Sequence, residues 1–145
     1  MLIQERMSGN KWYKSTVQEL FYQVCEDRPE KTAIVYGGAD ISYKALQDRV
    51  NKLSHALLKL GVKKGDHVCM LPSPTPEFVF LYYAVLQIGA VINPLNLLWG
   101  QIEFSGILKR NDPKLIVAVD KYGGRDFIQL LKDSIPDLEV RGNMV

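Results

Sequence analysis

Two short segments of this 145-residue chain carry residue types that could bind an anion. The first is Asp120-Lys121-Tyr122-Gly123-Gly124-Arg125, which lies between an apolar run at 115–119 and a helical pattern at 126–134. Open α/β sheets bind ligands where a strand ends, and glycines there let backbone N–H groups approach a phosphate. Arg125 could pair with such an anion. However, the segment matches neither the phosphate-loop nor the dinucleotide glycine spacing, and a plain turn before the helix explains it equally well.

The second segment, residues 71–78, occupies the equivalent position one repeat earlier in the chain. Its three prolines, Pro72, Pro74 and Pro76, each remove a backbone hydrogen-bond donor. This composition favours a stiff loop over an anion cradle.

The two histidines and two cysteines form no catalytic or metal-binding pattern. His55 and His67 share no ligand-like spacing with cysteine or acidic residues, and the sequence has no nucleophile-elbow motif. Cys25 and Cys69 lack the spacing of a cysteine pair, so we interpret them as buried free thiols in a reducing compartment. The residues alone therefore predict no catalytic, cofactor-binding or metal-binding site.

The composition narrows the class of protein. A net charge of +2 gives no reason to expect nucleic acid or an anionic membrane surface as a partner, and 47% apolar residues argue against disorder. The N-terminus mixes charges of both signs and has no apolar core of a signal peptide. We therefore expect a cytoplasmic protein.

The stretch from Thr75 to Trp99 organises the chain, and it carries no charge after Glu77. Its length raises the question of a membrane span. Thr75 and Pro76, however, predict a helix start, and Gly89 predicts its end. Residues 90–92 then read as a short buried strand that ends at Asn93-Pro94. We predict one apolar helix that leads into one strand, and no transmembrane segment.

The other segments predict further alternation of helices and strands. The capping-box pattern at Thr16 begins a helix, a Gly37-Gly38 turn separates strands at 32–36 and 40–43, and Ser42 caps the next helix. That helix has an apolar stripe, and later segments add two strands and two helices. The stripe consists of Leu46, Val50, Leu53, Leu57 and Leu60. We expect the strands at 66–71 and 115–119, and the helices at 102–108 and 126–134.

This alternation predicts an α/β fold, with a mostly parallel sheet and helices on both faces. We expect residues 1–14 to be an N-terminal arm and residues 15–145 to be one partial α/β subdomain. A last predicted strand, which begins at Leu138-Glu139-Val140, has no closing helix. We therefore expect the chain to be a fragment of a longer polypeptide.

Several segments, in order, carry a family resemblance: 16–21 (TVQELF), 31–36 (KTAIVY), 41–46 (ISYKAL) and 86–96 (LQIGAVINPLN). Together, from about Thr16 to Val119, they resemble the opening of the adenylate-forming enzymes, which include acyl-CoA synthetases, luciferases and non-ribosomal adenylation domains. Asn93-Pro94-Leu95-Asn96 is more similar to the fatty-acyl-CoA ligase branch than to the amino-acid branch.

The resemblance implies a longer parent enzyme, an AMP-forming acid–thiol ligase. Such a ligase converts a fatty acid or another carboxylate with Mg-ATP to an acyl-adenylate, and then to a thioester with CoA. The family's phosphate loop and catalytic lysine match nothing in this sequence, so no catalytic, cofactor-binding or metal-binding residue is carried over.

We therefore expect the fragment to be inactive by itself, to bind ATP, Mg and CoA poorly, and to self-associate. An alternative remains open. The chain could be a free-standing α/β module that binds a ligand or partner through the Asp120–Arg125 turn.

Overall fold

The computed structural model of the chain describes residues 15–71, 73–135 and 138–139. It forms two compact units that divide after Lys52, within the helix α3 (Tyr43–Lys59). The predicted arm at residues 1–14 lies outside the described residues. The boundaries predicted for the arm and the subdomain therefore stay predictions.

The first unit contains the helix α2 (Val17–Asp27), the strands β1 (Thr32–Tyr36) and β2 (Ala39–Ser42), and the start of α3. The predicted capping box is confirmed: the Thr16 N–H donates to the Glu19 carboxylate at 2.7 Å, and the Glu19 N–H donates to the Thr16 hydroxyl at 3.2 Å. The first of these bonds is the main reason that the pKa of Glu19 is lowered.

The hairpin of β1 and β2 turns at Gly37 and Gly38, which both have positive φ. On α2, Cys25 is a buried free thiol whose Sγ lies 3.6 Å from the Tyr43 carbonyl oxygen. Burial raises the pKa of Cys25 to about 11. This thiol therefore stays protonated at neutral pH, as the sequence predicts for a core residue.

The apolar stripe of α3 is confirmed at Leu46, Val50 and Leu57, which are buried. Leu53 and Leu60 are only half-buried. Ser54 takes the buried position instead, and its hydroxyl donates to the Ala84 carbonyl at 3.3 Å. The buried face follows steps of four and three residues from Val50, so it passes through Ser54 rather than Leu53.

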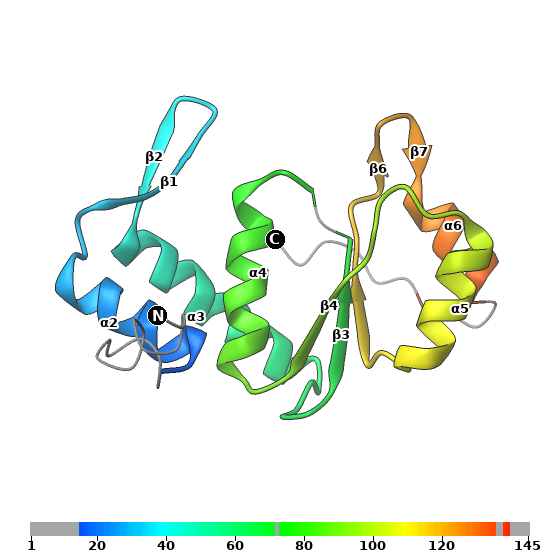
Figure 1. The fold of residues 1–145 in the computed structure, drawn as a ribbon, viewed down its shortest axis with the longest axis horizontal. Coiled ribbons are helices and arrows are strands. Elements are labelled where there is room, and N and C mark those ends of the chain that lie inside the picture. Colours follow the sequence, from blue (N-terminus) through cyan, green and yellow to red (C-terminus); the bar gives the residue numbers. More distant parts are fainter. Residues whose placement is uncertain (1–14, 72, 136–137, 140–145) are drawn as a thin grey trace, which may run out of the picture. The chain divides into compact units, whose positions relative to one another are not determined.

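The second unit is built on a three-stranded parallel sheet in the order β4-β3-β5. Figure 1 shows the helix α4 on one face of this sheet and the helices α5 and α6 on the other. The elements are β3 (His67–Met70), α4 (Pro76–Gln87), β4 (Val91–Pro94), α5 (Gln101–Asn111), β5 (Leu115–Val117) and α6 (Phe127–Ser134). The predicted α/β fold, with a mostly parallel sheet and helices on both faces, is confirmed.

The helix α4 begins and ends where the sequence predicts. Thr75 is its N-cap residue, Pro76 is its first residue, and Gly89 follows its end with a φ of 72°. A Cβ on Gly89 would lie 2.9 Å from Cγ of Lys64, so space as well as φ favours glycine there. Among the described residues, no helix is long and apolar enough to span a membrane.

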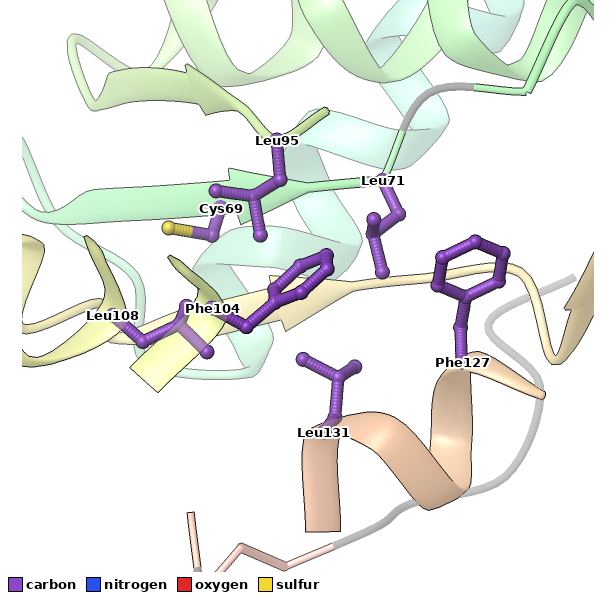
Figure 2. Packing of buried hydrophobic residues seen from close by; sticks show 7 residues of the cluster. All are labelled: Cys69, Leu71, Leu95, Phe104, Leu108, Phe127 and Leu131. Atoms are coloured by element: carbon purple, nitrogen blue, oxygen red, sulfur yellow. The ribbon is translucent and has the colours of Figure 1, made fainter. Parts of the chain in front are cut away.

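A cluster of buried side chains fills the space between the sheet and the helices α5 and α6. Figure 2 shows how side chains from β3, from the end of β4 and from both helices converge there. Full burial of each large member stabilises the fold by about 1.5–3 kcal/mol before entropy is subtracted. We call this set the α5–α6 core: Cys69, Leu71, Leu95, Phe104, Leu108, Phe127 and Leu131.

The structure corrects one sequence prediction for the C-terminal part, and another lies partly outside the described residues. The plain turn expected before α6 is instead a hairpin of two short strands, β6 (Lys121–Tyr122) and β7 (Arg125–Asp126). The predicted strand at 138–140 does not begin at Leu138 or Glu139, which carry no strand. Its third residue, Val140, lies outside the described residues.

Candidate functional site

The three parallel strands end at the same edge of the sheet, at Met70, Pro94 and Val117. We call this the carboxyl edge. The segments that follow the strands are joined there, because Leu95 N–H donates to the Met70 carbonyl at 2.8 Å and Leu71 N–H donates to the Val117 carbonyl at 2.9 Å. Ligands of open α/β sheets bind beyond this edge. It is therefore the candidate site, and both segments singled out by sequence lie on it.

The Asp120–Arg125 segment forms a tight hairpin at the carboxyl edge. Gly123 and Gly124 have φ values of 57° and 77°, so both glycines serve the turn between β6 and β7. The N-terminus of α6 is capped from within, since the Gln129 N–H donates to the Asp126 carboxylate at 2.9 Å. The segment therefore has the geometry of a hairpin rather than of a phosphate loop that opens a helix.

Arg125 is engaged by the protein itself. Its guanidinium donates to the carbonyl oxygens of Leu97 and Trp99 and lies over the Phe127 ring, 5.3 Å from the ring centroid. These two bonds use two of the five N–H donors of the guanidinium and hold the side chain against the backbone of another segment. This geometry gives Arg125 a structural role, since it joins the β6–β7 hairpin to the segment at Leu97 and Trp99.

The segment from Leu71 to Pro76 also uses its polar groups internally. The hydroxyl groups of Ser73 and Thr75 lie 3.1 Å apart, and the Thr75 N–H donates to the Ser73 carbonyl at 2.7 Å. The Thr75 side chain makes no capping hydrogen bond to α4. Pro72 lies outside the described residues. The described part of this loop agrees with a stiff connection.

The segment around Leu97 and Trp99, to which Arg125 donates, carries no motif that we singled out in the sequence. Asn96 organises it, since the Asn96 side-chain oxygen accepts a hydrogen bond from the Leu98 N–H at 2.9 Å. Gly100 and Glu103 then start α5, because the Gly100 N–H donates to the Glu103 carboxylate at 3.0 Å. An asparagine whose side-chain oxygen accepts from the N–H group two residues later is a turn signal that the sequence does contain.

The remaining candidate residues lie apart from this edge. Cys69 is fully buried in the centre of the sheet, and its Sγ lies 4.0 Å from Nδ2 of Asn111. Burial raises the pKa of Cys69, and the Asn111 contact offsets part of that rise. His55 is exposed on α3, and His67 starts β3 at the opposite edge of the sheet, where it lines a shallow depression. The prediction that both cysteines are buried free thiols is confirmed.

The fit of the described residues to ATP and Mg²⁺ can be tested on this geometry. Within residues 15–71, 73–135 and 138–139, no three histidine, cysteine or acidic side chains form a group that could hold a metal ion. The arginine nearest a turn of glycines is bound to backbone carbonyls.

Comparison with known proteins identifies the class. The family model described as "AMP-binding enzyme" matches residues 21–143, which is most of the chain. The chain therefore belongs to the family of AMP-binding, adenylate-forming enzymes. This confirms the resemblance stated from the ordered sequence segments.

Individual relatives agree with the family. YdaB of Bacillus subtilis, named as an acyl-CoA ligase, is 31% identical over 123 residues, which are 85% of this chain and 24% of YdaB. A Rhodopseudomonas palustris structure named as a long-chain-fatty-acid CoA ligase has a TM-score of 0.75 and 25% identity, over 89% of this chain and 32% of that one. The anthranilate CoA ligase AuaEII, solved with anthranoyl-AMP, has the same fold, with a TM-score of 0.74 and 20% identity over 86% of this chain and 24% of that one.

These matches also show how much of such a protein the chain represents. It spans about a quarter of the length of the curated relatives it matches, 23% and 24% for the first two.

Proposed function

We propose that this chain is the N-terminal part of an AMP-forming acyl-CoA ligase. The observation that carries the proposal is the family match over residues 21–143, together with coverage of only 23% and 24% of two relatives. The proposed whole enzyme activates a carboxylate with ATP and Mg²⁺ to an acyl-adenylate and transfers the acyl group to CoA.

We propose a fatty acid as the carboxylate. The Asn93-Pro94-Leu95-Asn96 segment supports this, since it resembles the fatty-acyl-CoA ligase branch. The Rhodopseudomonas palustris structure named as a long-chain-fatty-acid CoA ligase supports it as well. The fold alone does not favour a fatty acid, because an anthranilate ligase shares it.

We also propose that the 145-residue chain forms no acyl-adenylate by itself. Adenylate formation depends on positioned donors and a metal ion. The described residues provide no metal-binding group, and Arg125 is bound to the carbonyls of Leu97 and Trp99. The alternative of a free-standing module that binds a ligand or partner through the Asp120–Arg125 turn is less well supported, because Arg125 already donates to two backbone carbonyls.

Pyrophosphate release tests these proposals. The purified chain and the product of its gene read past Val145 are each given ATP, Mg²⁺, CoA and a panel of fatty acids and aromatic acids. We expect no release above a no-protein blank for the chain, and Mg²⁺-dependent release with fatty acids for the longer product. Turnover by the chain itself, or a stop codon directly after Val145, would contradict the fragment proposal. Turnover with aromatic acids alone would contradict only the choice of substrate.

Two further properties belong to the proposal. The buried free thiols Cys25 and Cys69 support a reducing, cytoplasmic location. The chain exposes large apolar side chains, among them Val35, Leu98 and Ile102, and this supports self-association of the isolated chain. Light scattering that stays monomeric across a concentration series would contradict self-association.

A further inference from the structure

The segment from Leu97 to Gly100, which we call the edge loop, connects β4 to α5 at the carboxyl edge. Leu97 and Trp99 are half-buried against the α5–α6 core, and the Trp99 ring meets the Phe104 ring edge-on at 6.2 Å. Leu98, between them, points outward and is 86% exposed. In the edge loop, the packed side chains of Leu97 and Trp99 therefore flank the exposed side chain of Leu98.

The backbone of the edge loop is held both by local hydrogen bonds and by a long-range partner. Local bonds fix its start, because the N–H groups of Leu98 and Trp99 donate to the side chain and the carbonyl of Asn96, respectively. The two carbonyls on either side of Leu98, those of Leu97 and Trp99, both accept hydrogen bonds from Arg125, which is 26 or more residues later in the chain. Arg125 is thus the long-range polar contact of this loop.

Arg125 is well suited to hold two acceptors at once. Its planar guanidinium presents several donors in a fixed arrangement, which a lysine ammonium cannot do. Its other contact is the face of Phe127, a fully buried member of the α5–α6 core. The side chain therefore links the edge loop to a fully buried ring of the α5–α6 core.

We propose that Arg125 is a latch that fixes the edge loop at the carboxyl edge, and that opening the latch frees this loop while the sheet stays folded. The geometry of two bridged carbonyls next to a rigid aromatic ring carries this inference. It goes beyond the proposed function and does not depend on it, because it concerns the conformation of this chain.

The latch has a consequence for the surface. Leu98 and Ile102 are four residues apart and are 86% and 87% exposed. With the latch closed, the edge loop presents Leu98 on an ordered backbone.

Residue-level amide hydrogen exchange on the full 145-residue chain tests the latch. The variants are Arg125→Ala and Arg125→Lys, and Lys121→Ala is the matched control because it removes an exposed cation from the same hairpin. For Arg125→Ala we expect the amides of Leu98 and Trp99 to exchange about tenfold faster or more. The amide of Leu95, bonded to the Met70 carbonyl in the sheet, reports on global stability and should change little.

Arg125→Lys should give an intermediate rise, because one ammonium cannot bridge both carbonyls as the guanidinium does. Lys121→Ala should leave the edge loop unchanged. Unchanged exchange at Leu98 and Trp99 in Arg125→Ala would overturn the proposal. An equal rise at Leu95 in both Arg125 variants would overturn it too, since Arg125 would then be a general stabilising residue. If Arg125→Ala does not fold, Arg125→Lys alone decides between these outcomes.

Discussion

The two glycine-turn hairpins of this chain have nearly the same turn and very different surroundings. Gly37 and Gly38, between β1 and β2, have φ values of 58° and 80°, and Gly123 and Gly124, between β6 and β7, have 57° and 77°. The β1–β2 hairpin has the longer strands, yet Val35 beside its turn is 72% exposed. The β6–β7 hairpin has only two residues per strand.

The short β6–β7 hairpin is anchored by one residue within it, Arg125, and by the residue that follows β7, Phe127. Arg125 reaches the edge loop, and Phe127, which follows β7, is fully buried. An isolated two-stranded ribbon is at best marginally stable, whatever its turn. In the β6–β7 hairpin, side chains with long-range partners therefore supply the anchoring contacts that its short ladder cannot.

The largest expected effect tests that anchor directly. Phe127→Ala should lower the free energy of unfolding by about 3–5 kcal/mol, because it leaves a cavity in the α5–α6 core and removes the ring beneath Arg125. The matched change in the other hairpin, Val35→Ala, should cost about 0.5 kcal/mol or less, since that side chain is exposed. Chemical denaturation of both variants measures this. Similar losses of unfolding free energy in the two variants would show that the buried Phe127 ring is not what distinguishes the two hairpins.

An intermediate effect is expected at the turns. A Cβ at Gly38 or Gly124 would meet nothing within 4 Å, so alanine at either position perturbs only the backbone conformation. Alanine in the left-handed region costs roughly 1–2 kcal/mol.

For Gly124→Ala we expect most of that cost in the global unfolding transition, because the β6–β7 hairpin is tied to the core. For Gly38→Ala we expect faster amide exchange in β1 and β2 with a smaller change in the unfolding midpoint, since that hairpin can loosen locally. Equal shifts of the midpoint would show that both hairpins are equally coupled to the rest of their units.

The smallest expected effect concerns charge. Lys121 and Asp126 form a cross-strand ion pair of 3.9 Å, and both side chains are well exposed. Lys121→Ala should therefore change the free energy of unfolding by only about 0.2–0.5 kcal/mol, and the difference from the unmutated chain should fade as salt is added. Denaturation at low and high ionic strength measures it. A loss as large as that of Phe127→Ala would mean that charge, not burial, anchors the hairpin.

The sequence predicted the features that depend on neighbouring residues. The Thr16–Glu19 capping box, the start of α4 at Pro76 and its end before Gly89 follow from local backbone chemistry, and each is confirmed. The alternation of helices and strands likewise predicted the parallel sheet. The ordered segments from Thr16 to Val119 identified the family.

Features that depend on distant residues could not be predicted in this way. Two-residue strands such as β6 and β7 are too short to show a periodic pattern. The partners of Arg125 lie 26 and 28 residues away, so its occupied guanidinium is invisible in the local sequence. Ser54 replaces Leu53 on the buried face because its hydroxyl finds an acceptor on α4, which no helical pattern reveals.

The strand order β4-β3-β5 has a consequence for the way the chain is made. β3 is synthesised first of the three and occupies the middle, so each later strand meets an edge that already exists. β4 follows α4 and can pair with β3 once β4 itself has left the ribosome, and β5 can add to the other side of β3 later. The β6–β7 hairpin emerges after the edge loop that Arg125 binds. Arg125 is synthesised after Leu97 and Trp99, so its bonds to their carbonyls can form only once all three parallel strands have been made.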